Sequence, residues 1–183
     1  FPVRTPDELR AGIQEIIDEW GKKWDCTASE GSLSGNFSHI VRSIHESAGE
    51  KVVILIDEYD KPILDTVEDI QTAIGMRDIL KDFYGVLKSL DPYLKFVMLT
   101  GVSKFVKTGI FSGLNNLNDI TLDSAYSGIC GYTEDDISTI FHSWLSKYSI
   151  EQVREWYDGY SWTGEHVYNP FDILLLFSKK VFR

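Results

Sequence analysis

The chain has 183 residues, of which 43% are hydrophobic and 13% are aromatic, so it can bury a core and global disorder is excluded. This length fits one domain, or one domain with a small appendage. The formal net charge of −10 argues against a surface for nucleic acid, because that binding depends on lysine and arginine side chains that neutralise phosphates. We therefore expect no nucleic-acid partner for this chain.

Nothing in the sequence indicates a membrane or an exported protein. The apolar run at residues 173–177 is far shorter than the roughly 20 residues of a membrane span, and no signal peptide is visible. Cys26 and Cys130 form no CxxC pair, and the four histidines show no HExxH spacing. We expect two thiols in a cytoplasmic protein, with a disulfide as the alternative. Because the chain opens on Phe1 without a methionine, we expect it to be a piece of a longer protein.

Two helices are predicted at the start of the chain. Thr5 can cap the first, Pro6 suits its first position and Glu8 can close a capping box, so a helix should run from there to about Trp24. Residues 25–35 are small and polar and predict a loop. Apolar residues at helical spacing then predict a second helix over residues 37–48.

An α/β unit is predicted next. Residues 51–56 are apolar on both faces and rich in β-branched side chains, which is typical of a parallel strand that helices cover on both sides. A helix is predicted over residues 70–90 and a second buried strand over residues 94–99, which together make a βαβ unit. A polar loop follows, and residues 119–122 predict a short third strand.

The last part of the chain predicts a small helical subdomain. Thr133 starts a helix, with Asp136 placed to close a capping box, and this helix should continue to Tyr148. Helix is expected again from Ile150, then an aromatic, turn-rich segment, then a final helix from about Phe171. We expect a core at residues 1–131 and a helical lid or adaptor at residues 132–183.

Acidic and hydroxyl side chains follow the two predicted strands. Asp57 and Glu58 come directly after the first strand, and Thr100 follows the second, with Ser103 behind it. Ligands of open α/β sheets bind beyond the carboxyl ends of the strands. There Asp57 can hold Mg²⁺ through water, while Glu58 orients and deprotonates a water that attacks a γ-phosphate. Thr100 can bond that water or the phosphate; the alternative for these residues is that they end strands and meet solvent.

A phosphate-binding loop is missing from the sequence. Such a loop reads GxxxxGK[ST] between a strand and a helix. The nearest match is GVSKFVKT, Gly101 to Thr108, in which Val106 takes the place of the second glycine. A side chain there blocks the approach of the backbone to phosphate, so we do not interpret this segment as a phosphate loop.

Other candidates have simpler alternatives. Arg77, expected to begin a helix after a loop, and Arg154 could act as arginine fingers on a neighbouring γ-phosphate, or lie solvated on helices. Lys104 and Lys107 could reach phosphate but are expected to face solvent. Three acids could form the metal site of a nuclease, but the sequence lacks the D…ExK pattern that such a site needs. Six aromatic residues could form a stacking platform for bases, but they have few basic neighbours, so we expect them to pack in a core instead. The acids are Asp57, Glu58 and Asp60, and the aromatic residues are Trp156, Tyr157, Tyr160, Trp162, Tyr168 and Phe171.

Long motifs resemble those of the AAA-ATPase-like family of bacterial proteins. The resemblance runs from about Thr5 to the end of the chain. The motifs are IDEYDKPILD at 56–65, DFYGVLK at 82–88, LTGVSKF at 99–105, IFSGLNNLNDITLD at 110–123, ICGYTEDD at 129–136, YDGY at 157–160 and VYNPF at 167–171.

The resemblance implies a three-layer P-loop NTPase core of the AAA+ type with a mostly parallel sheet, of which this chain holds an incomplete part. It implies that Asp57 and Glu58 are Walker B acids and that Thr100 is a sensor residue. Members carry an N-terminal phosphate loop of the form GRRxFGKS, and some carry a C-terminal nuclease-like domain; neither lies in this chain. The strand that bears the phosphate loop would lie between residues 94–99 and residues 119–122, so we expect a gap or an exposed apolar edge in the sheet. The chain is then expected to close its sheet differently or to self-associate.

These features predict part of an ATPase that couples ATP hydrolysis to a conformational change. In the longer protein Asp57 would position Mg²⁺, Glu58 would be the base, Thr100 and Arg77 would assist catalysis, and Ser103 would contact the nucleotide. ATP and Mg²⁺ are the cofactors expected there, and none is expected to bind this chain alone. The alternative is a non-catalytic interaction module derived from an ATPase.

Overall fold

The computed structural model describes most of the chain and divides it into two compact units. The units are Phe1–Leu117 and Asn118–Arg183, whereas the sequence predicted a boundary after Gly131. The residues described are 3–26, 31–103, 109–111, 114, 116–145, 147–161 and 166–182, with the side chains at 158 and 160 excepted.

Two helices open the first unit, and side chains define where each begins. α1 spans Pro6–Lys23 and starts with the predicted capping box, in which Thr5 and Glu8 each accept a hydrogen bond from the other's backbone N–H. α2 spans Leu33–Ala48 and begins before the predicted residue 37, because the Ser32 hydroxyl caps it by accepting from the Gly35 N–H. Gly49 ends α2 in the left-handed conformation, with φ of 68°.

The predicted α/β unit is present. β1 spans Val52–Ile56 and β2 spans Leu94–Leu99, and the two pair in parallel. Between them lie α3 (Lys61–Leu64), α4 (Ile70–Gly85) and a 3₁₀ turn at Val86–Lys88. The first unit is therefore α/β, with a small parallel sheet and several helices.

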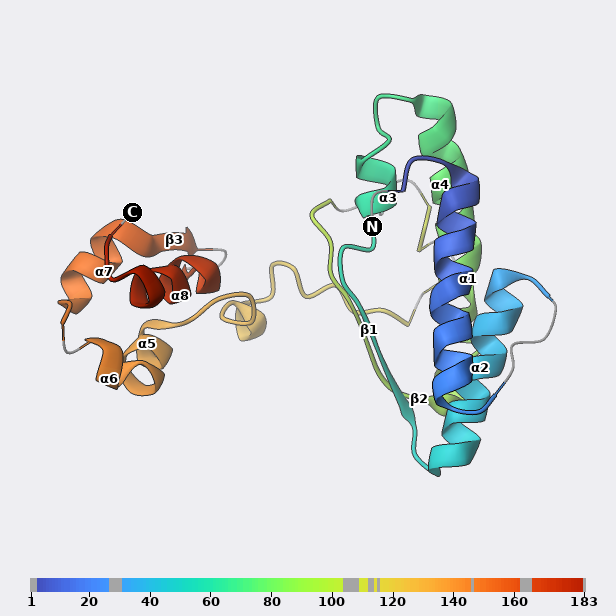
Figure 1. The fold of residues 1–183 in the computed structure, drawn as a ribbon, viewed down its shortest axis with the longest axis horizontal. Helices are drawn as coiled ribbons and strands as arrows, with labels where there is room; N and C mark the ends of the chain where they lie inside the picture. Colours follow the sequence, from blue (N-terminus) through green and yellow to red (C-terminus); the bar gives the residue numbers. More distant parts are fainter. Residues whose placement is uncertain are drawn as a thin grey trace. The chain divides into compact units, whose positions relative to one another are not determined.

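The core of the first unit lies where α1, α2 and α4 pack together and against β1 (Figure 1). Ile40 of α2, Met76 of α4 and Leu90 after the 3₁₀ turn are fully buried. Polar contacts connect the same helices, since Asn36 donates to Gln14 of α1 at 2.9 Å and the Ser34 hydroxyl donates to Asp82 of α4 at 3.1 Å. This helical packing supports the two-stranded sheet on one side.

One face of the two-stranded sheet is open in the part of the chain that the structure describes. Ile54 faces the core and is 8% exposed, whereas its neighbours Val53 and Leu55 are 49% and 70% exposed. Phe96, the register partner of Val53, is 52% exposed. The expectation that the first strand is buried on both faces is therefore wrong here, because no described element covers this second face.

The open face predicts that the 183-residue chain self-associates. Val53, Leu55 and Phe96 present apolar surface next to strand edges that no strand among the described residues covers, and both features favour pairing with a second chain. We expect light scattering at rising concentration to report a mass above the monomer's 20.9 kDa. Replacing Leu55 with Lys should restore the monomer, while Lys at exposed Glu46 should not. A monodisperse monomer of the unmodified chain would contradict this prediction.

The predicted strand at residues 119–122 is wrong. The segment forms a turn, because the Asp119 carboxylate accepts the Thr121 N–H at 3.1 Å and the Asp123 N–H donates to the Ile120 carbonyl at 3.1 Å. An aspartate that bonds the backbone two residues on is typical of turns. A second aspartate, Asp123, then caps a 3₁₀ turn at Ser124–Tyr126.

Helices and a hairpin form the second unit. α5 spans Glu134–Ile140 and starts with the predicted capping box of Thr133 and Asp136. The helix does not continue to Tyr148 as predicted; it is interrupted at Phe141, and α6 spans His142–Leu145. α7 spans Ile150–Tyr157 and α8 spans Pro170–Lys179, close to the predicted starts.

The aromatic segment of the second unit forms a hairpin that the sequence did not predict. β3 (Asp158–Ser161) pairs antiparallel with β4 (His166–Tyr168). Tyr157 and Tyr168 are buried in the core of this unit, as expected for core aromatics. Trp156 and Phe171 are instead 56% and 70% exposed. Trp162 and the side chain of residue 160 lie outside the described residues.

The expectations about membrane spans and about the two cysteines can be compared with the described residues. None of the helices in this part of the chain has the length and apolar character needed to cross a membrane. Cys26 and Cys130 are both free thiols, with Cys26 half-buried and Cys130 exposed.

Candidate active site

The ends of β1 and β2 place the predicted acids beside the predicted sensor residue. Ile56 and Leu99 are register partners at the ends of the two strands. The pairing continues beyond them, because the Thr100 N–H donates to the Ile56 carbonyl at 2.8 Å and the Tyr59 N–H donates to the Thr100 carbonyl at 2.9 Å. The segments that follow β1 and β2 therefore continue side by side beyond the sheet, with Asp57 opposite Thr100.

A direct hydrogen bond joins Asp57 to Thr100. The Thr100 hydroxyl donates to Asp57 Oδ1, which also accepts the Glu58 N–H at 3.0 Å. Asp57 Oδ2 has no hydrogen-bond partner among the described residues, and the side chain is exposed. One carboxylate oxygen is thus oriented by its neighbours and the other is open to a ligand.

Glu58 adopts the left-handed backbone conformation, with φ of 50°. For a residue other than glycine this costs on the order of 1 kcal/mol, and such residues gather at functional sites. The turn that results leaves the Glu58 side chain exposed and sends the next two residues, Tyr59 and Asp60, into the interior. The carboxylate of Glu58 is therefore accessible to water at the end of the sheet.

The nearby Lys61 forms an ion pair with Asp65 and not with Glu58. Lys61 Nζ donates to Asp65 Oδ1 at 3.0 Å, one helical turn away. The hydrogen bond and charge of Asp65, and more weakly the charge of Glu58, raise the pKa of Lys61. Lys61 is thus held on α3 and does not neutralise Glu58 directly.

Asp60 and Tyr59 hold the loop that follows β2. Asp60 Oδ2 accepts the Ser103 N–H at 2.5 Å, and Asp60 Oδ1 accepts the Val102 N–H at 3.3 Å. The Tyr59 hydroxyl donates to the Ser103 carbonyl at 2.6 Å. Ser103, predicted to contact a nucleotide, is thus fixed through its backbone beside the acids. Neither buried residue was predicted to have this role.

The phenol of Tyr84 supports this arrangement from α4. Its hydroxyl lies 3.4 Å from the carbonyl of Tyr59, to which it donates. Burial, followed by the charge of Asp60 and the proximity of Tyr59, raises the pKa of Tyr84 well above its usual range. The phenol therefore stays protonated and remains a donor at any physiological pH.

Each of the two candidate arginines forms an ion pair with an acid of its own unit. Arg77 lies inside α4, so the expectation that it begins a helix is wrong; its Nε and Nη2 donate to Asp78 Oδ1 at 2.9 and 2.7 Å. Arg154 belongs to the second unit, where its guanidinium pairs with Glu134. Lys104, Lys107 and most of the near match to a phosphate loop lie outside the described residues.

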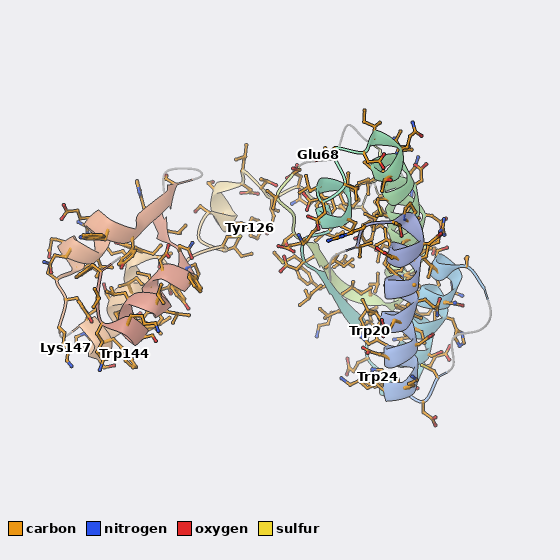
Figure 2. The ribbon with its side chains drawn as sticks, turned by 45° about the horizontal axis from the view of Figure 1, so that its top comes forward. Trp20, Trp24, Glu68, Tyr126, Trp144 and Lys147 are labelled. Atoms are coloured by element: carbon orange, nitrogen blue, oxygen red, sulfur yellow. The ribbon has the colours of Figure 1, made fainter. Side chains whose placement is uncertain are left out.

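An apolar groove of about 420 Å³ borders the acids, and the sequence did not predict it. α1 forms one wall with Ile13, Ile16 and Trp20, and Figure 2 shows Trp20 on this helix one turn before Trp24. Leu55 of β1 and Phe83 of α4 line it further, and Asp57 and Glu58 lie at its rim. The sequence signal that was available is the run of apolar residues at helical spacing on α1, of which Ile16 and Trp20 remain 48% and 41% exposed in the structure.

The exposed acids fit a magnesium ion that a nucleotide brings with it. Among the residues that the structure describes, no group of three His, Cys, Asp or Glu side chains could hold a metal ion alone. Asp60, the third acid of the cluster in the sequence, points to the loop after β2 instead. Mg²⁺ needs only one or two carboxylates when phosphates and water supply the remaining ligands, and the open oxygen of Asp57 suits that arrangement.

Comparison with known proteins identifies one family. The model of the family described as Predicted AAA-ATPase matches residues 1–111. An uncharacterized protein in the vnfD 5′ region of Azotobacter chroococcum mcd 1 is 47% identical over 183 residues. That match covers 99% of this chain and 35% of the relative, so the chain spans about a third of the relative's length. No solved structure matches. The chain belongs to the predicted AAA-ATPase family.

Proposed function

We propose that this chain supplies the hydrolytic half of an ATP site in a longer ATPase. The observation that carries the proposal is the contact between Asp57 and Thr100 at the adjoining ends of two parallel strands, with Glu58 exposed beside them. Ligands of parallel sheets bind at this edge. The membership of the predicted AAA-ATPase family supports the same conclusion.

Each side chain then has a role that its geometry permits. Asp57, with one oxygen oriented by Thr100 and the other open, would bind a water of the nucleotide's Mg²⁺. Glu58, exposed and unpaired with Lys61, would orient the attacking water and accept its proton. Bound Mg²⁺ would neutralise charge on the phosphates. Thr100 would connect Asp57, the proposed magnesium-binding residue, to the loop after β2. Arg77 would act as an arginine finger only on the γ-phosphate of a neighbouring molecule.

Phosphate release by the whole gene product that contains this chain tests the proposal. We expect hydrolysis of ATP that depends on Mg²⁺. Replacing Asp57 with Asn should move the Mg²⁺ dependence to higher concentration, because the amide removes the charge that attracts the hydrated ion. Either an absence of ATP hydrolysis in the whole gene product or an unchanged Mg²⁺ dependence in the variant would count against the proposal.

The second candidate function is a non-catalytic interaction module, and the open face of the sheet favours it. Val53, Leu55 and Phe96 would serve there as a binding surface. The two functions differ in the rest of the gene product. A segment of the form GxxxxGK[ST] ahead of this chain favours the ATPase. Without such a segment, the interaction module is the better interpretation.

A further inference from the structure

Asp60 is an acid whose surroundings differ from those of its exposed neighbours. Its side chain is fully buried, at 0% exposure. Aspartate is almost never buried unless its charge is paired or hydrogen-bonded, because removing a carboxylate from water is costly. Here the two carboxylate oxygens accept backbone N–H groups of Val102 and Ser103. Both oxygens are therefore used by the loop after β2, so Asp60 is not placed as a metal ligand.

The loop lies tightly against the turn that contains Asp60. A Cβ atom at Gly101 would come within 2.5 Å of Tyr59 Cε1 and 2.7 Å of Asp60 Oδ1, so only glycine allows this approach. Ser103 is held at both ends of its backbone, by Asp60 at its N–H and by the Tyr59 hydroxyl at its carbonyl. The two turns therefore behave as one packed element.

The same element includes the contact between Thr100 and Asp57. The Thr100 N–H donates to Ile56 at the end of β1, its carbonyl accepts from Tyr59, and its hydroxyl reaches Asp57. Two of the next three residues, Val102 and Ser103, are fixed by Tyr59 and Asp60. A movement of the loop would pull on Thr100 directly, because Gly101 is the single residue between Thr100 and the part that Asp60 holds.

We propose that Asp60 is a positioning residue, whose buried carboxylate holds the loop of residues 101–103 so that Thr100 stays on Asp57. The effect on catalysis rests on the proposed ATPase function, while the effect on the loop does not. Asp60 would thus act through Thr100 and touch neither nucleotide nor metal.

Amide hydrogen exchange on the 183-residue chain tests the loop. Asp60→Asn keeps the shape of the side chain but replaces one acceptor oxygen with an NH₂ group. Because hydrogen bonds to charged groups are the stronger ones, we expect exchange at Val102 or Ser103 to rise by about tenfold or more. The control is Asp65→Asn, an acid on the same segment whose partner is Lys61 and not the loop. Unchanged exchange at both amides would overturn the proposal.

A second variant covers the case in which Asp60→Asn does not fold. Tyr59→Phe removes only the hydroxyl that holds the Ser103 carbonyl and leaves the buried ring in place. We expect the Ser103 N–H to stay protected from exchange in this variant, because Asp60 still accepts it. Exchange of that N–H as fast as in an unstructured peptide would show that Asp60 does not hold the loop and would overturn the proposal.

Steady-state kinetics of the whole gene product separate positioning from simple stabilisation. We expect Asp60→Asn to lower kcat for ATP about tenfold while KM changes by less than about threefold, because the nucleotide is not touched. A loosened loop with an unchanged kcat would overturn the positioning role. If the wild-type protein hydrolyses no ATP, the proposed function fails, and the exchange measurements alone then decide whether Asp60 holds the loop.

Discussion

Glu58→Gln should abolish ATP turnover by the whole gene product and leave ATP bound. Glutamine keeps the size of the side chain but cannot accept a proton from the attacking water. General-base catalysis contributes about 10²- to 10⁴-fold to rates, so phosphate release should fall by at least 10²-fold. The nucleotide should stay bound because the proposed role of Glu58 is on the attacking water, whereas a GxxxxGK[ST] segment would cradle the phosphates. Phosphate release and equilibrium binding of labelled ATP measure the two effects separately.

A matched control is available in the same unit of the chain. Glu68 is an exposed glutamate in the connection between α3 and α4 (Figure 2), so Glu68→Gln makes the same chemical change outside the turn that follows β1. We expect this variant to turn over ATP at the wild-type rate. Unchanged turnover in Glu58→Gln would remove Glu58 from its role as base.

Gly101→Ala should destabilise the first unit by about 1–3 kcal/mol, the range measured when a packed region is overfilled. The new methyl group would meet the ring of Tyr59 and the carboxylate of Asp60, and the nearest ring atom would be 2.5 Å away. Neither neighbour can turn aside, because both are buried and hydrogen-bonded to Ser103. Chemical denaturation of the 183-residue chain measures the change in the free energy of unfolding.

Gly12→Ala is the opposite control for that experiment. Gly12 lies inside α1, and a Cβ atom there meets nothing within 4 Å. Alanine favours a helix over glycine by about 1 kcal/mol, so this variant should be more stable than the wild type. Equal stability of Gly101→Ala and the wild type would show that the loop does not lie against Tyr59 and Asp60.

Features with a local cause were predicted well from the sequence. The capping box at Thr5 depends on residues three positions apart, and the helix starts where it was predicted. β2 has the predicted bounds, and β1 begins one residue after the predicted start, because short apolar β-branched runs with clear breaks define strands. One contact between distant residues was also predicted: Asp57 and Thr100 lie 43 positions apart, and the rule that parallel strands end together places them at one edge.

Features that depend on distant partners were predicted poorly. The hairpin of β3 and β4 requires Asp158 to pair with Tyr168, and the segment shows no alternation of apolar and polar residues that would predict strands. The opposite error occurred at residues 119–122, which were predicted to form a strand, whereas Asp119 bonds the backbone locally into a turn. The role of Asp60 was also missed, because its partners lie more than forty positions along the chain.

Calorimetric titration of ATP·Mg²⁺ tests the central claim most directly. If this chain holds only the hydrolytic half of an ATP site, the 183-residue chain should give no heat of binding, because it carries no GxxxxGK[ST] segment to cradle phosphates. The whole gene product should bind the nucleotide. Micromolar affinity in the 183-residue chain alone, or no binding by the whole gene product, would contradict the claim.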